Sequence, residues 1–290
     1  MKAFWRRLFS TVILVALFVF ILTGPDRYAN FIFDIIATVF SYVAVYEFGL
    51  ILLKSGHSFA LRRTSCFTAL TTAAVAFFPQ YAAFFIPFAI AAYVIYSWTR
   101  FLTGKNQEHA MRSIFASAFA YFMFAVPFCI VVKVYQAGTA ADYHMLFLYL
   151  VLVTKIGDIA AYVTGSLSGY ALRNHGGNHK MIPSISPGKS YEGAVGGFIF
   201  TLLLSYFLWP LCNVETVFGN FWTSMILGVL MFFGCMAGDL SESAFKRTCK
   251  IKDSGSILPG IGGVLDLVDS LLVTAPLFLL YLLCAGKISL

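Results

Sequence analysis

Long apolar segments recur from one end of this chain to the other, separated by short polar connections. Each segment has about 20 residues, which is enough for a helix to cross a hydrocarbon layer of ~30 Å. Backbone N–H and C=O groups find no water inside a bilayer, so helices are the usual way to cross it. The pattern therefore predicts an all-α, polytopic integral membrane protein.

The segments and the turn signals between them predict about nine transmembrane helices. These cover residues 8–23, 29–53, 64–79, 82–103, 110–134, 144–168, 192–210, 220–240 and 264–285. The connection at Phe78-Pro79-Gln80 is short, which leaves open that the third and fourth segments form a re-entrant pair. We expect the first segment to be an uncleaved span, because no small-residue cleavage site precedes Thr23-Gly24-Pro25.

The positions of lysine and arginine predict the orientation of the chain. With a cytoplasmic N-terminus, 16 of the 20 basic residues fall on the cytoplasmic side or at that end of a span. Arg27, Lys133 and Lys287 fall outside, and Lys155 lies within a span. The net charge of +7 is thereby explained by topology and anionic headgroups, so we expect no nucleic-acid partner. The six cysteines are scattered and predict neither disulfides nor a zinc site.

A few charged residues lie inside the apolar segments, where ionised groups are costly. Asp34 and Glu47 lie in the second segment, and we favour a structural role for both. Lys155 and Asp158 lie three apart in the sixth segment, so they share a helix face and can form an ion pair. For Asp158 we give more weight to a functional role, because its segment leads into a polar loop.

The first large polar loop, residues 169–191, carries a candidate phosphate-binding turn. Gly188-Lys189-Ser190 is like the end of a P-loop, but Pro183 stands where the first glycine would be, so we exclude a P-loop. Hydroxyl groups of Ser184 and Ser186, with backbone amides and the Lys189 ammonium, would bind phosphates. The alternative is a solvated connector. His175 and His179 have no helical face to share, so we do not expect a metal there.

The second loop, residues 241–263, is flanked by two pairs of carboxylates. Asp239 and Glu242 are three apart, and so are Asp266 and Asp269, which puts each pair on one helix face. Such oxygen ligands suit two hard divalent cations. The basic residues between them would face phosphates; they are Lys246, Arg247, Lys250 and Lys252. The alternative is that these residues only set the topology and that the acids cap the ninth helix.

At these positions the chain resembles the phosphatidate cytidylyltransferase (CDP-diacylglycerol synthase) family over roughly residues 150–285. The downstream residues that match the family's signature in type and spacing are Ser243, Lys246, Arg247, Lys252, Asp253, Pro259, Gly260, Gly262, Gly263, Asp266 and Asp269. The upstream residues that match are Asp158, Ala161, Tyr162, Ser184, Ser186, Lys189, Ser190, Glu192, Gly193, Gly196 and Gly197. Two positions depart from the signature: Ile261 replaces a histidine, and Leu267 replaces an arginine.

The resemblance implies transfer of the cytidylyl group of CTP to phosphatidate within the bilayer, with release of pyrophosphate. It implies Mg²⁺, with K⁺ as a second cation, held by Asp239, Asp266 and Asp269. The catalytic residues it implies are Asp239, Lys246, Arg247, Lys252, Asp253, Asp266 and Asp269. The substrate-binding residues it implies are Asp158, Ser184, Ser186, Lys189, Glu192, Ser243, Gly260, Gly262 and Gly263.

The resemblance also implies where the protein works and how it is organised. We expect a homodimer in a bacterial-type cytoplasmic (inner) membrane, with the N-terminus and the active site at the cytoplasmic face. Residues 1–143 would form an N-terminal transmembrane region of about five spans. Residues 144–290 would form the catalytic region, with cytoplasmic loops 169–191 and 241–263.

Three other functions remain open from the sequence. One is a related CTP-dependent lipid enzyme, either a polyprenol kinase or an isoprenoid-lipid cytidylyltransferase. Another is a carrier that uses the charged residues inside the spans, although the polar cluster at one membrane face argues against it. The third is a catalytically weakened or inactive member of the family, because of Ile261 and Leu267.

Overall fold

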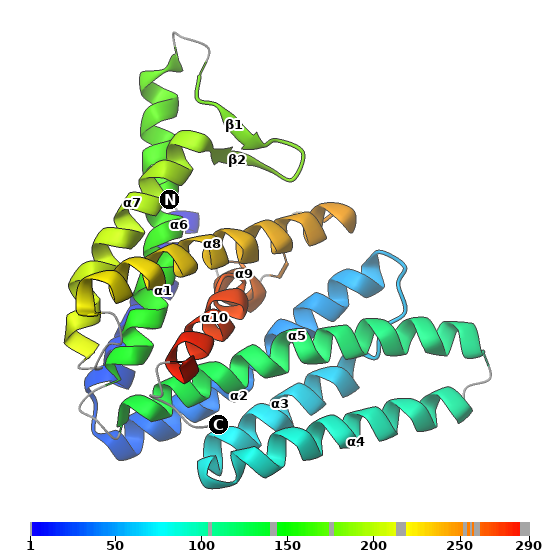
Figure 1. Ribbon diagram of the computed structural model, residues 1–290. Helices are drawn as coiled ribbons and strands as arrows, with labels where there is room; N and C mark the ends of the chain where they lie inside the picture. Colours follow the sequence, from blue (N-terminus) through cyan, green and yellow to red (C-terminus); the bar gives the residue numbers. More distant parts are fainter. Residues whose placement is uncertain are drawn as a thin grey trace. The chain divides into compact units, whose positions relative to one another are not determined.

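The computed structural model describes residues 2–103, 106–139, 144–173, 177–212, 219–251, 254–255, 257 and 262–284. Its described residues are almost entirely helical, which confirms the all-α prediction (Figure 1). Within the described residues, seven helices are long and apolar enough to cross a membrane, namely Asp26–Lys54, Pro79–Thr103, Gln107–Ala137, Met145–Ala171, Tyr191–Cys212, Asn220–Thr248 and Val264–Cys284. The protein is therefore a polytopic integral membrane protein.

Each predicted span overlaps a helix, but the ninth, 264–285, is interrupted at Asp269 and Ser270, and two of the nine are not among these seven. Helix α1 (Lys2–Thr23) contains a shorter apolar stretch, Leu8–Thr23. Helix α3 (Leu61–Phe77) has 17 residues and a lower apolar content. The count of nine membrane crossings stays a prediction.

The chain divides into two compact units. The first unit comprises Met1–Thr139 and Thr248–Val268. Its elements are α1, α2 (Asp26–Lys54), α3, the short 3-10 helix η1 (Pro79–Tyr81), α4 (Ala82–Thr103), α5 (Gln107–Thr139) and α9 (Val264–Val268). The second unit comprises Ala140–Arg247 and Asp269–Leu290. Its elements are α6 (Met145–Ala171), β1 (Lys180–Ile182), β2 (Ser186–Ser190), α7 (Tyr191–Leu208), η3 (Trp209–Cys212), α8 (Gly219–Thr248) and α10 (Leu271–Cys284).

In the first unit, α2, α3 and α5 pack against one another. The Phe33 ring of α2 stacks on Tyr135 of α5 with centroids 3.7 Å apart, and Phe48 meets Phe124 edge-on at 5.4 Å. These aromatic pairs add to the stabilisation that burial of their rings provides.

One face of helix α3 is buried, although it is rich in threonine. The hydroxyls of Thr64, Thr68, Thr71 and Thr72 each donate to the carbonyl four residues earlier, at 2.8–3.0 Å. Because these bonds satisfy the hydroxyls within the helix, α3 can pack without strongly apolar side chains. This explains why its hydropathy is lower than that of its neighbours.

In the second unit, α6 and α7 lie side by side at glycine positions (Figure 1). A Cβ atom on Gly193 would lie 2.6 Å from the Ala161 carbonyl oxygen, and one on Gly197 would lie 2.8 Å from the Gly157 carbonyl oxygen. Small residues at such spacing let two membrane helices approach closely. The contact fixes α6 relative to the start of α7.

The loop predicted over residues 169–191 contains a two-stranded antiparallel sheet, which the sequence did not indicate. Strands β1 and β2 pair Lys180 with Ser190 and Ile182 with Ser186 (Figure 1). The strands have three and five residues and β2 includes Pro187, so they carry little apolar alternation. Ser190 ends β2 and also caps α7, because its hydroxyl accepts a bond of 3.1 Å from Gly193 N.

Candidate functional site

Helix α8 (Gly219–Thr248) carries Asp239, Glu242, Ser243, Lys246 and Arg247, and so includes residues 241–248 of the predicted loop 241–263. The helix continues to Thr248, beyond the predicted end of its apolar span at residue 240. The last turns are polar, so hydropathy misses them, but Glu242 and Lys246 form an i,i+4 ion pair there. Asp239, Glu242, Ser243 and Lys246 therefore share one helix face.

Three carboxylates meet in the second unit. Asp239, Glu242 and Asp269 each offer an oxygen, and these three atoms all lie within 4.8 Å of one another. Glu242 and Asp269 are each only 7% exposed. Gly238 lets α8 approach the backbone of Asp269 closely, because a Cβ at position 238 would lie 2.6 Å from the Asp269 carbonyl oxygen. We call Asp239, Glu242 and Asp269 the acidic cluster.

Each carboxylate of the acidic cluster faces the ammonium group of a different lysine. The pairs are Lys189 Nζ with Asp239 Oδ2 at 2.7 Å, Lys246 Nζ with Glu242 Oε1 at 3.1 Å, and Lys155 Nζ with Asp269 Oδ1 at 3.7 Å. The lysines come from β2, α8 and α6, so separate elements bring them to one place. Three positive charges thereby offset three negative charges, which lowers the repulsion between the closely spaced acids.

Asp158 belongs to a hydrogen-bond network beside this cluster. The Ser270 hydroxyl lies 3.1 Å from Asp158 Oδ2 and 3.0 Å from Asp269 Oδ1. Cys235 Sγ lies 3.0 Å from the other Asp158 oxygen. Lys155 Nζ is 4.0 Å from Asp158, so the pair predicted from the i,i+3 spacing is present at the limit of an ion pair. Asp158 therefore helps to orient Ser270 and Asp269.

The hairpin is tied to α7 and α8 by two of the predicted residues. Arg247 Nε donates to the Ile185 carbonyl at 3.3 Å, in the turn that also contains Ser184. The Glu192 carboxylate accepts from His179 N at 3.1 Å and lies 2.7 Å from His179 Nδ1. Glu192 thus holds the hairpin formed by β1 and β2 to the start of α7. Ser186 and Lys189 lie on β2 of this hairpin.

Asp266 lies in the first unit, at the start of α9. Its Oδ2 accepts from Gly263 N at 2.9 Å and from Ser254 Oγ at 2.6 Å. The hydrogen bond from Gly263 N to the Asp266 side chain is one half of a capping box at the start of α9. Gly262, two residues earlier than α9, has φ +124°, a conformation that favours glycine. Among the described residues, the acidic cluster does not include Asp266.

Glu47 holds the same segment from α2. Its Oε2 accepts a 2.9 Å hydrogen bond from Leu265 N in the first turn of α9, and the residue is 1% exposed. Gly255 and Gly263 leave room for it, because a Cβ at either position would collide with the Glu47 carboxylate. Sequence reasoning assigned Glu47 a structural role without a partner, since 218 residues separate it from Leu265. The only signal was a carboxylate within an apolar helix.

Other predicted residues add little to this geometry. Ser243 Oγ is 3.5 Å from Asp239 Oδ1, which is a long hydrogen bond. Lys252, Asp253, Gly260 and Ile261 lie outside the described residues. Leu267, which departs from the signature, lies in α9.

The helical fold and the acidic cluster define a membrane-embedded protein whose carboxylates fit a divalent cation. The chain belongs to the cytidylyltransferase family, whose model matches residues 5–285. This match confirms the resemblance predicted from the sequence.

Several curated proteins are similar to this chain. Phosphatidate cytidylyltransferase of Haemophilus influenzae is 39% identical over 144 residues, which cover 48% of this chain and 47% of that protein. Phosphatidate cytidylyltransferase of Staphylococcus haemolyticus is 32% identical over 186 residues, 64% of each chain. The Escherichia coli K12 protein called uncharacterized protein YnbB is 37% identical over 138 residues, 48% of this chain and 42% of that protein. The matched stretches thus span 42–64% of the length of these three relatives.

Proposed function

We propose that this protein transfers the cytidylyl group of CTP to phosphatidate, forming CDP-diacylglycerol and pyrophosphate. The observation that carries the proposal is the acidic cluster, in which each of three carboxylates faces its own lysine. A reaction between two multiply charged phosphates needs such a mixture of cation ligands and ammonium groups. The relatives named phosphatidate cytidylyltransferase support the choice of substrates.

The acidic cluster would hold a divalent cation, and we propose Mg²⁺ because its ligands here are hard carboxylate oxygens. When bound, such a cation supplies positive charge to the phosphates of CTP and to the leaving pyrophosphate. Glu242 joins Asp239 and Asp269 as a proposed ligand. Asp266 stays a predicted ligand, and K⁺ a predicted second cation.

The lysines around the cluster would bind the substrate phosphates. Lys155, Lys189 and Lys246 approach the carboxylates from three elements, so they surround the place where phosphates would bind. Arg247 is held by the Ile185 carbonyl beside the hairpin. We propose that these side chains neutralise CTP and the lipid phosphate, with the Ser186 hydroxyl and Lys252 contributing to the same cradle.

The chemistry needs no proton acceptor on the protein. A phosphate monoester carries close to two negative charges at neutral pH. An oxygen of the lipid phosphate attacks the α-phosphorus of CTP, the bond from that phosphorus to the bridging oxygen breaks, and pyrophosphate leaves. Because the nucleophile is already ionised, isoleucine at position 261 is compatible with turnover.

We place this reaction at the cytoplasmic face of a bacterial-type inner membrane. The lipid would enter from the bilayer and CTP from the cytoplasm. The basic residues at one side of the predicted spans support this orientation. The family resemblance supports a homodimer.

A product-resolved assay tests the proposal. The purified full chain in detergent is mixed with Mg²⁺, labelled CTP and phosphatidate, and pyrophosphate and CDP-diacylglycerol are measured together. We expect both in equal amounts, lost in Asp239→Asn and kept in Glu108→Gln, whose carboxylate is exposed on α5. Formation of CDP without pyrophosphate would indicate a lipid kinase instead. A folded protein that forms neither product would contradict catalysis.

A further inference from the structure

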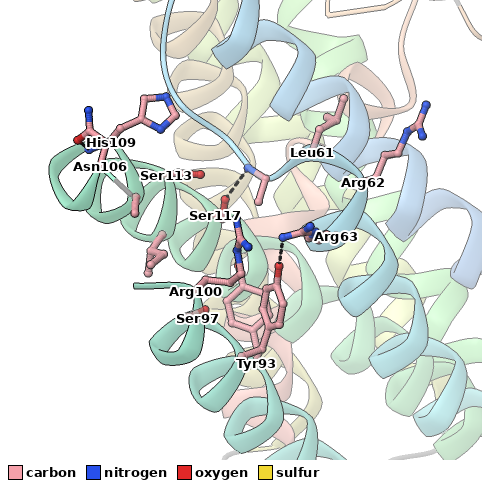
Figure 2. Close-up of a pocket in the computed structure, with 14 residues that line it drawn as sticks. Leu61, Arg62, Arg63, Tyr93, Ser97, Arg100, Asn106, His109, Ser113 and Ser117 are labelled. Atoms are coloured by element: carbon pink, nitrogen blue, oxygen red, sulfur yellow. Dashed lines mark hydrogen bonds between the residues drawn. The ribbon is translucent and has the colours of Figure 1, made fainter. Parts of the chain in front are cut away.

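A pocket of about 470 Å³ lies among α3, α4 and α5 in the first unit, which does not contain the acidic cluster (Figure 2). Its volume is in the range that holds small ligands. Its polar and basic lining includes Arg63, Ser97, Arg100, His109, Ser113 and Ser117. The described lining contains no aspartate or glutamate.

Two arginines of this pocket come from different helices. Arg63 on α3 and Arg100 on α4 extend toward the same part of the pocket (Figure 2). Arg63 Nη1 donates to the Tyr96 hydroxyl at 2.5 Å, and the guanidinium lies 5.7 Å from the centroid of that ring. Tyr96 therefore fixes the guanidinium while engaging only one of its five N–H donors.

The described part of the chain gives these arginines no counter-charge. Among its ion pairs, none involves Arg63 or Arg100. Two cations that share a pocket repel each other, and an anion between them would remove that repulsion. A guanidinium binds phosphate through two parallel N–H bonds, which suits a tetrahedral oxyanion. The pocket thus has the chemistry of a phosphate site.

The pocket also lies where a membrane-spanning helix ends. Arg100 is in the last turn of α4, which ends at Thr103, and α5 begins at Gln107. The preceding turns of α4 expose large apolar side chains, with Phe88 72% and Trp98 65% exposed. Such a helix faces lipid, and basic pockets at the ends of membrane helices bind anionic headgroups.

We propose that this pocket of the first unit binds the phosphate of an anionic phospholipid. Arg63 and Arg100 bind the phosphate oxygens. Ser97, Ser113 and His109 contact the polar headgroup, and the acyl chains lie along the exposed face of α4. Lipid binding in this pocket does not depend on the cytidylyltransferase reaction, so it is tested by measuring binding alone.

Native mass spectrometry of the full chain tests this site. The protein is reconstituted in neutral phosphatidylcholine with a minor fraction of phosphatidylglycerol, and retained phosphatidylglycerol is measured. We expect the pair Arg63→Gln/Arg100→Gln to reduce retention about tenfold, because two charge-assisted contacts are lost. Arg112→Gln removes one positive charge at an exposed arginine on α5 that pairs with Glu108, and should leave retention unchanged.

A lysine double variant and a titration with inorganic phosphate complete the experiment. The pair Arg63→Lys/Arg100→Lys keeps both charges and should retain more phosphatidylglycerol than the glutamine pair, which rules out a mere loss of folding. Inorganic phosphate is titrated in parallel; arginine-dependent binding of phosphate without lipid would support the phosphate chemistry but assign a soluble source. Equal lipid and phosphate binding by the wild type and the glutamine pair would overturn the proposal.

Discussion

The Lys189 ammonium lies 2.7 Å from Asp239 Oδ2, and this contact joins strand β2 to the end of α8. It places a positive charge directly on a carboxylate that is a candidate cation ligand. A bound divalent cation and Lys189 therefore compete for the same oxygen. The phosphates of a nucleotide, by contrast, would be attracted by both.

This competition gives the Lys189→Gln variant two effects of opposite sign. Removal of the ammonium should lower the Mg²⁺ concentration needed for half-maximal activity about fivefold, since one nearby repulsion is lost. Turnover at saturating Mg²⁺ should fall, because the phosphates lose a positive partner. Steady-state kinetics over a Mg²⁺ titration measure both. Lys180→Gln, an exposed lysine on β1 of the same hairpin, should change neither. An unchanged Mg²⁺ requirement in Lys189→Gln would show that the ion pair does not compete with the cation.

Glu242→Gln should reduce turnover about 100-fold, as loss of a preorganised electrostatic group at a reaction centre typically does. Glu242 is buried within the acidic cluster, so its charge acts at short range. The measurement is kcat at saturating CTP, with the unfolding midpoint recorded on the same samples. Glu108→Gln is the control. Near wild-type turnover in a folded Glu242→Gln protein would remove Glu242 from the site.

Glu47→Ala should destabilise the fold by about 1–3 kcal/mol, because Leu265 N–H would lose its acceptor in a buried position. Glu47→Gln keeps an amide oxygen that can accept the same bond, so its effect should be smaller. Thermal unfolding in detergent compares the two, and Glu108→Ala supplies an exposed control. If both Glu47 variants unfold at the same temperature as the wild type, the hydrogen bond to α9 does not contribute to stability.

Gly193→Ala should cost about 1–3 kcal/mol, since the added methyl group would push α7 away from the Ala161 carbonyl. Gly188→Ala is a matched control, because a Cβ at that position meets no atom within 4 Å. Turnover should fall with stability in Gly193→Ala only, as α6 carries Lys155 and β2 leads into α7. Equal stability of both variants would argue against close helix packing at Gly193.

Most of the helical architecture could be predicted from the sequence, because apolar segments of membrane length are a strong signal. Every predicted span overlaps a helix, although the ninth is divided into α9 and α10. The hairpin and the last turns of α8 were missed, since both are polar and short and hydropathy does not detect them. The i,i+4 spacing of Glu242 and Lys246 predicts their ion pair only if a helix is assumed at these residues.

The site was predictable in composition but not in arrangement. Spacing along the chain identified Asp239 and Asp269, which do meet in the structure. It could not show that Lys155, Lys189 and Lys246 each face one carboxylate, because these residues come from elements that only the fold brings together. The hydrogen bond between Glu47 and Leu265 of α9 could not be predicted for the same reason, because the two residues are far apart in the sequence.

Mn²⁺ binding to the full chain tests whether Asp239, Glu242 and Asp269 hold a divalent cation, as we propose. Electron paramagnetic resonance measures free Mn²⁺ as the wild type, Asp239→Asn/Glu242→Gln and Glu108→Gln are titrated without nucleotide. We predict that the wild type and Glu108→Gln bind Mn²⁺ alike and that the double variant loses a binding site. Identical binding by all three proteins would show that these carboxylates do not hold the cation.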